Sequence, residues 1–218
     1  MVTMIFPNLF QEGEVGKLKA KNRLVMPAMH TNLGDPEDGL AEPGIDFYVA
    51  RARGGFGQIG VGIIDSFQFE HASPGEFLLD NNRHIKVHER LVKRLRDEGA
   101  LSFAQIGLRR VWSLNQMRRK PSLSEFKDKE IRTWIQAVID TAKRAIEAGY
   151  DGIDLLGNGG GAISIFTSQV FNDRTDDWGG DEDRRLNFAL AIVGGIRSAI
   201  GDQYPITCLL YTSPSPRA

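Results

Sequence analysis

The sequence is poor in cysteine, has no long hydrophobic run and has no excess of charge of either sign. Its single cysteine, Cys208, excludes an internal disulfide framework and is typical of a reducing compartment. A formal net charge of −1 over 218 residues gives no indication of a nucleic-acid or membrane surface. No apolar stretch approaches the roughly 20 residues that span a bilayer, and residues 1–10 do not resemble a secretory signal. These absences predict a cytoplasmic protein, and the sequence does not indicate an oligomeric state.

What the sequence does contain is a regular alternation of strand-like and helix-like segments. A chain of 218 residues with 24 glycines is long enough to form one large domain with several backbone-lined loops. Alternating strands and helices predict a parallel sheet with right-handed crossovers, and five such units are too few to close an eight-stranded barrel. Expected strands cover residues 24–29, 57–64, 101–106, 153–156 and 205–209, expected helices cover 43–53, 83–98, 131–150 and 184–200, and a small hairpin is expected at 13–21.

The C-terminal residues break this pattern. Residues 209–218 contain two prolines and no periodicity, and they interrupt a strand that has barely started. We therefore predict a domain over residues 1–208 followed by a tail, 209–218, that does not look native.

Four sequence blocks occur together in order: Asn22–Thr31, Tyr48–Gly55, Gln105 at a strand end, and Asn172–Gly180 with Arg185. On these blocks, the chain from about Phe6 to Cys208 resembles the old yellow enzyme family of FMN-dependent oxidoreductases, particularly its 2,4-dienoyl-CoA reductase-like branch. The resemblance implies an α/β fold, here an incomplete TIM (β/α)8 barrel of about five βα units with an N-terminal hairpin cap. It implies FMN at the carboxyl ends of the strands. It also implies hydride transfer from NADH or NADPH, through the flavin, to an electron-poor alkene such as an enone or enoyl thioester.

The resemblance carries over to particular positions in this sequence. Pro27, Ala28, Met29 and His30 would lie along the flavin, although Pro27 and Ala28 could equally form a buried strand end. His30 could hydrogen-bond flavin or substrate, or could be structural. Gly62 would let the ring approach the second strand, the alternative being a β-bulge. A primary amide at Gln105 would match the O2/N3 edge of the flavin pyrimidine, the alternative being a surface glutamine.

At four positions the sequence departs from the family pattern. The family's carbonyl-binding pair and proton-donating Tyr correspond to Leu156, Gly159 and Gly161, none of which can donate a proton from its side chain. The proton could come from water or from His30, the substrate could need none, or reduction could be lost. Leu209 stands where the family has an Arg, and the strands that hold the FMN phosphate by resemblance are missing. We therefore expect a C-terminally truncated copy of a longer enzyme, and keep a non-catalytic flavin-binding or scaffold protein as the alternative.

Three further patterns are interpreted as structural. The sequence Gly157-x-Gly159-x-x-Ala162 is a weak dinucleotide fingerprint, because a polar turn segment follows where a second strand would be needed. The charges of Arg174, Asp176 and Arg185 are expected to tie the loop after the fourth strand to its helix. The i, i+4 pair His84 and His88 is expected on a solvated helix face, so no metal site is predicted.

Overall fold

The main sheet is parallel and its strand order follows the chain. A computed structural model describes residues 6–66, 75–108, 122–158 and 161–210. In it the strand order is β3-β4-β6-β7-β8, with β5 paired to the end of β4. These strands are β3 (Val25–Met26), β4 (Gln58–Asp65), β5 (Phe77–Leu78), β6 (Leu101–Gly107), β7 (Gly152–Leu156) and β8 (Ile206–Leu209).

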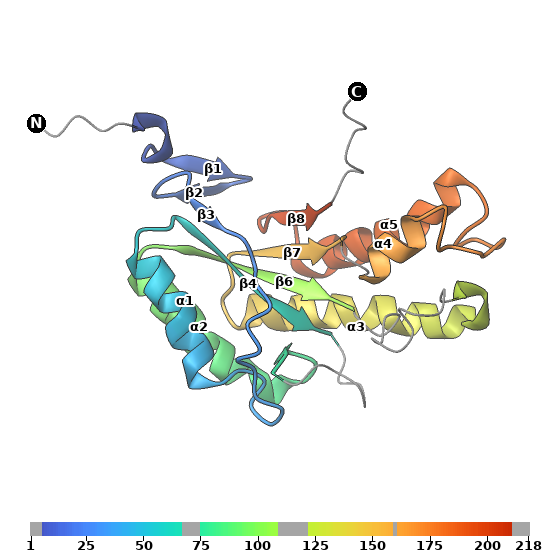
Figure 1. The fold of residues 1–218 in the computed structure, drawn as a ribbon, viewed down its shortest axis with the longest axis horizontal. Coiled ribbons are helices and arrows are strands. Elements are labelled where there is room, and N and C mark those ends of the chain that lie inside the picture. Colours follow the sequence, from blue (N-terminus) through green and yellow to red (C-terminus); the bar gives the residue numbers. More distant parts are fainter. Residues whose placement is uncertain (1–5, 67–74, 109–121, 159–160, 211–218) are drawn as a thin grey trace, which may run out of the picture.

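Helices follow the strands and cover one face of the sheet, which curls into an arc (Figure 1). Apart from the short β5, each strand of this sheet lies beside the one before it in the chain, so the strand order never reverses. A dinucleotide-binding sheet instead reverses its order partway, and the observed order is that of a partial (β/α) barrel. The helices are α1 (Glu42–Arg53), α2 (Ile85–Asp97), α3 (Asp128–Glu147), α4 (Ala162–Thr167) and α5 (Glu182–Ile200), with 3-10 turns at Pro7–Leu9, Asn82–His84 and Leu123–Glu125.

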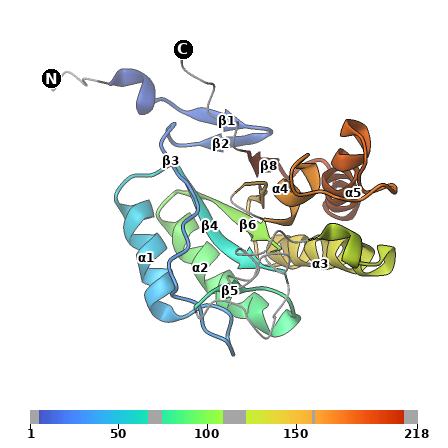
Figure 2. The ribbon, with the colours of Figure 1, turned by 45° about the vertical axis from the view of Figure 1, so that its right-hand side comes forward.

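A small antiparallel hairpin, β1 (Gly13–Val15) and β2 (Leu18–Ala20), precedes the sheet, as predicted. Gly16 takes a φ of +60° at its turn, a conformation that glycine adopts at little cost. The hairpin turn lies near the connection that enters β8, where Lys17 Nζ is 3.2 Å from the Asp202 carboxylate. The hairpin therefore lies at the amino ends of the strands and does not cover their carboxyl ends (Figure 2).

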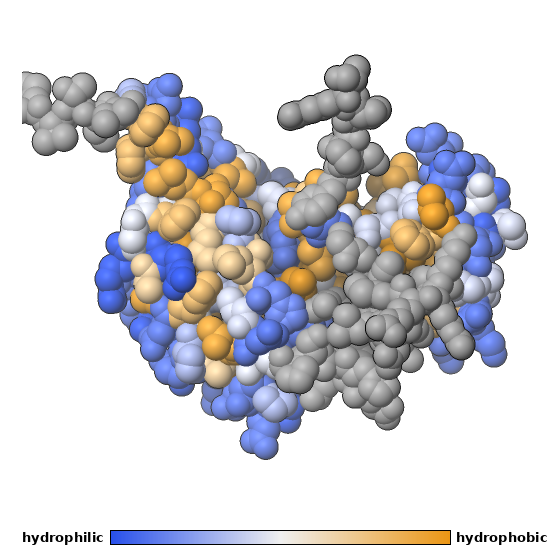
Figure 3. Space-filling model, viewed as in Figure 1, coloured by the Kyte–Doolittle hydropathy of each residue, from blue (hydrophilic) through white to orange (hydrophobic). Residues whose placement is uncertain are grey.

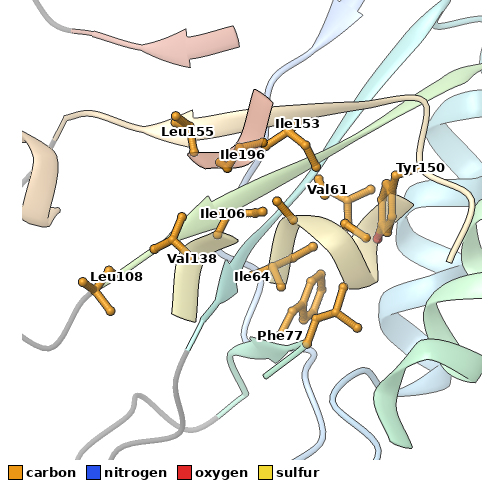
Figure 4. Close-up of a cluster of buried hydrophobic side chains, with 14 of the residues drawn as sticks. Val61, Ile64, Phe77, Ile106, Leu108, Val138, Tyr150, Ile153, Leu155 and Ile196 are labelled. Carbon is orange, nitrogen blue, oxygen red and sulfur yellow. The ribbon is translucent and has the colours of Figure 1, made fainter. Parts of the chain in front are cut away.

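The hydrophobic core fills the space between the sheet and the helices. Figure 4 shows strand side chains such as Ile106 and Leu155 meeting Val138 of α3. The stripe predicted for α3 is buried, with Ile131 and Trp134 at most 2% exposed. Burial of each such side chain contributes about 1.5–3 kcal/mol before entropy is counted. Because alternate strand residues point to opposite sides, Gln105 faces away from this core.

The observed elements differ from the prediction mainly in length. The strand predicted over residues 24–29 is only two residues long, because the chain leaves the sheet at Pro27, which has no N–H to donate. The short β5 was not predicted. Leu209, the first residue of the predicted tail, is the last residue of β8. Residues 211–218 of that tail lie outside the described residues, and so does Gly159.

Hydrophobic surface (orange in Figure 3) lies beneath the N-terminal hairpin. In the described part of the chain β3 pairs only with β4, so it forms one edge of the sheet. Val25 and Met29, in and just after this edge strand, are each 51% exposed. Within the described ranges, no helix has the length and apolar character needed to cross a membrane.

Candidate active site at the strand ends

Two of the segments predicted to form the site are joined by the phenol of Tyr48. Its Oη lies 3.3 Å from the carbonyl oxygen of Met29 and accepts a hydrogen bond from the Gly62 amide at 3.2 Å. The ring comes from α1 and is completely buried, and burial raises the pKa of Tyr48 to about 12. Tyr48 therefore stays protonated and holds the chain after β3 against the middle of β4.

Replacing Tyr48 by phenylalanine is expected to lower the free energy of unfolding by about 1–3 kcal/mol, because the buried Gly62 N–H loses its partner. Tyr204→Phe is the matched control, at a ring packed on the margin of the core. Its expected effect is within about 0.5 kcal/mol. Urea unfolding of both variants makes the comparison, and equal losses would show that the phenol of Tyr48 does not hold the two segments together.

Gly62 lies at an irregularity in β4. The pairing of β4 with β6 shifts register between Val61 and Ile64, which is the bulge considered as the alternative for this glycine. Its φ is +146°, and a Cβ there would lie 2.7 Å from the carbonyl oxygen of Gln105. Close approach of the neighbouring backbone is therefore enough to require glycine here, whether or not a flavin contacts this position.

Gln105 is 3% exposed and is not a surface glutamine. Its Nε2 donates to Asp154 Oδ2 at 2.6 Å, and Thr207 Oγ1 donates to Asp154 Oδ1 at 2.7 Å. The three residues are paired in register on β6, β7 and β8. A row of polar groups thus crosses the face of the sheet that is turned away from the helices.

The remaining predicted residues follow β3. Pro27 and His30 are exposed and Ala28 is partly buried, so a fully buried strand end does not describe this segment. Its backbone packs closely on β4: a Cβ added at Gly60 would lie only 2.7 Å from the Ala28 amide nitrogen. The structure therefore brings the backbone of this segment, Gly62 and Gln105 to neighbouring strands at the carboxyl end of the sheet.

The polar segment after α4 is a structural clamp, but its partners differ from those predicted. Arg174 bonds Asp176 within the loop, and its Nη1 donates to the carbonyls of Leu123 at 2.6 Å and Phe126 at 2.7 Å. The loop is thus tied to the residues in front of α3, and the expectation that Arg174 ties it to its own helix was wrong. Arg185 Nε has no hydrogen-bond partner among the described residues.

The expectation of a solvated histidine pair was also wrong. His84 and His88 are both 0% exposed. His88 Nε2 lies 3.1 Å from the carbonyl oxygen of Leu78, and its Nδ1 lies 2.8 Å from Tyr150 Oη. A carbonyl can only accept, so Nε2 carries the proton and Nδ1 accepts from Tyr150. Burial lowers the pKa of His88 to about 4.

Sequence reasoning missed three residues that shape the site: Tyr48, Asp154 and Thr207. A charged residue inside the apolar run of β7 was a visible signal for Asp154. Tyr48 opens one of the blocks that carry the resemblance but was given no role, and Thr207 gave no comparable signal.

A concavity of about 610 Å³ lies on the hairpin, lined by Glu12, Gly13, Glu14, Lys19 and Arg23. It belongs to the amino ends of the strands, away from the residues described above.

Comparison with known proteins gives consistent matches. Residues 113–213 match the sequence profile of the NADH:flavin oxidoreductase / NADH oxidase family. The NADH oxidase of Thermoanaerobacter brockii is 35% identical over 93% of this chain and 34% of its own length. The structure of 2-naphthoyl-CoA reductase with 2-naphthoyl-CoA has a TM-score of 0.85 at 26% identity, over 94% of this chain and 35% of that one. The old yellow enzyme of Pichia sp. AKU4542 shares the fold, with a TM-score of 0.81 at 19% identity, over 92% of this chain and 59% of that one.

The sheet order, the helical layer and the polar strand ends define part of a (β/α) barrel that carries its site at the carboxyl ends of the strands. Together with the matches, they show what the chain is similar to: an old yellow enzyme-like protein of the NADH:flavin oxidoreductase / NADH oxidase family, whose sequence profile matches residues 113–213. FMN and a nicotinamide nucleotide are the cofactors of that family. The chain spans about a third of the length of the NADH oxidase it matches.

The residues at the strand ends fit the pyrimidine edge of a flavin. Gln105 directs one N–H to Asp154 and carries, in addition, a carbonyl oxygen and a second N–H. On the neighbouring strand, Gly62 lies against the backbone of Gln105, where a Cβ would meet the Gln105 carbonyl oxygen at 2.7 Å. Leu209, where the family has an Arg, brings no charge to this edge.

Proposed function

We propose that this chain forms the flavin-ring part of an FMN-dependent oxidoreductase. In this proposal, hydride passes from NADH or NADPH through FMN to a small electron-poor alkene such as an enone or enoyl thioester. The observation that carries the proposal is the buried amide of Gln105, held at the carboxyl end of the sheet beside Gly62. FMN, when bound, supplies the chemistry that accepts and passes on the hydride.

The residues of the chain would bind and orient the ring. Gln105 would pair with its pyrimidine edge, and the backbone of Pro27, Ala28 and Met29, together with Gly62, would lie along it. Tyr48 would keep these two segments at a fixed separation. His30, exposed at the same end of the sheet, is the candidate for holding the proton that completes alkene reduction.

A second reading is favoured by one specific observation. Leu156 and Gly161, at positions where the family has polar or proton-donating side chains, offer no such group. A protein that binds flavin without reducing an alkene would have this composition. Reduction of bound FMN by NADH or NADPH, followed by reoxidation with an enone or enoyl thioester, separates the two readings.

The proposal is tested by titrating the chain with FMN and following flavin fluorescence. Gln105→Met is expected to weaken FMN binding about tenfold or more, because a thioether of similar shape cannot pair with the ring. The matched control is Gln136→Met, at an exposed glutamine of α3 whose partner is Asp140. Absence of FMN binding, or equal affinity in both variants, would contradict the proposed site. Anaerobic addition of NADH and then NADPH to the FMN-loaded chain should bleach the flavin absorbance.

A further inference from the structure

The carboxylate of Asp154 is held from both sides by neighbouring strands. Gln105 Nε2 donates to Oδ2 at 2.6 Å from β6, and Thr207 Oγ1 donates to Oδ1 at 2.7 Å from β8. Because the three residues are in register, the contacts join adjacent strands directly across the sheet. Both oxygens of the carboxylate are thereby used, and its orientation is set by groups on either side.

This arrangement determines which way the amide of Gln105 faces. The two ends of a primary amide have nearly the same shape, so packing alone does not distinguish its two orientations. An ionised carboxylate only accepts hydrogen bonds, so it selects the orientation with the –NH2 end toward β7. The carbonyl oxygen of Gln105 is then directed away from Asp154. Thr207 supports this choice indirectly, by holding the carboxylate in place.

We infer that Asp154 is a positioning residue, which fixes the amide of Gln105 so that a flavin pyrimidine edge meets its carbonyl oxygen in one defined orientation. The inference rests on the proposed function, because it assigns the partner of Gln105 as a flavin. It adds that flavin affinity depends on a residue that need not touch the ring. Each bond involved is between protein side chains, so the preference exists before any flavin arrives.

The first test needs no flavin. In the 15N-labelled chain, the side-chain amide signals of Gln105 report its hydrogen bonding, and Asp154→Asn is expected to shift them. Asn can donate as well as accept, so it no longer selects one amide orientation. The matched control is Asp140→Asn, which alters the exposed Gln136–Asp140 pair of α3 and should leave the Gln105 signals in place. Unchanged Gln105 signals in Asp154→Asn would overturn the inference at this step.

The second test measures binding of FMN by fluorescence titration. Asp154→Asn is expected to weaken FMN binding about tenfold, Asp154→Glu to recover part of the loss, and Asp140→Asn to have no effect. A purely structural role would lower the unfolding midpoint of Asp154→Asn without changing the dissociation constant of the folded protein. That result, with FMN still bound by the unmodified chain, overturns the inference alone. If the unmodified chain does not bind FMN, the proposed function fails and the assignment of the flavin fails with it.

Discussion

Replacing Arg174 by alanine is expected to lower the free energy of unfolding by about 3 kcal/mol. The guanidinium is 8% exposed and donates to the backbone carbonyls of Leu123 and Phe126. Truncation removes this donor from both carbonyls, and among the described residues only that of Leu123 keeps another, the N–H of Phe126. The pairing with Asp176 adds less, because that carboxylate is 45% exposed and solvent can replace the arginine. Most of the loss therefore comes from the carbonyl groups rather than from the ion pair.

Two variants make this expectation specific. Arg174→Lys keeps the charge but lacks the planar fork that bonds both carbonyls through Nη1 and Asp176 through Nε and Nη2, so an intermediate loss is expected. Lys93→Ala removes an exposed i, i+4 pair with Asp97 on α2 and should change stability by less than about 0.5 kcal/mol. Urea unfolding at neutral pH measures all three. A loss for Arg174→Ala no larger than that for Lys93→Ala would show that the clamp in front of α3 does not support the fold.

The order of strands and helices could be predicted from the sequence because hydrophobic periodicity is local. The stripe of α3 and the apolar run of β7 need no knowledge of their partners. The same is true of Gln105, where an apolar strand ending in an amide predicted burial. The curl of the sheet followed from the resemblance to a family, not from the periodicity.

The pairing of side chains could not be predicted, since it depends on register between strands. About 50 residues separate Gln105 from Asp154, and about 50 more separate Asp154 from Thr207. They meet only because β6, β7 and β8 are aligned residue by residue. Arg174 likewise finds its acceptors about 50 residues earlier in the chain, in front of α3. A charge pattern within one loop therefore pointed to the wrong partner.

His88 of α2 shows a different kind of error, because the sequence did contain the answer. His88 follows Ile85 by three residues and precedes Leu91 by three, so it lies on the apolar stripe of the helix. The charged neighbours Lys86 and Glu89 belong to other faces. The period of the helix predicts burial of His88, whereas the composition of the segment predicts a solvated surface, and here the period was the better guide.

Burial of His88 predicts that the protein loses stability as the pH falls from about 6.5 toward 4. The unfolded chain binds a proton at His88 with the ordinary pKa of about 6.5, whereas the folded protein binds it only near pH 4. Below pH 6.5 the unfolded state therefore holds more protons, and protonation favours unfolding. Above pH 6.5 the imidazole is neutral in both states, so its contribution there is fully present and constant. Between pH 8 and pH 5 the expected loss of unfolding free energy is about 2 kcal/mol.

Comparison with His88→Gln isolates this contribution from that of other groups. Glutamine can still bond the carbonyl of Leu78 and the hydroxyl of Tyr150 but does not titrate, so its stability should be nearly flat between pH 8 and pH 5. Carboxylates with lowered pKa values, such as that of Asp176 beside Arg174, reduce the free energy of unfolding only when they become protonated at lower pH. Their contribution is the same in both proteins. Urea unfolding at pH 8, 6.5, 5.5 and 5 gives the two curves. Parallel curves would mean that His88 is not the group whose protonation unfolds the protein, and that the buried pair with Tyr150 accommodates the charge.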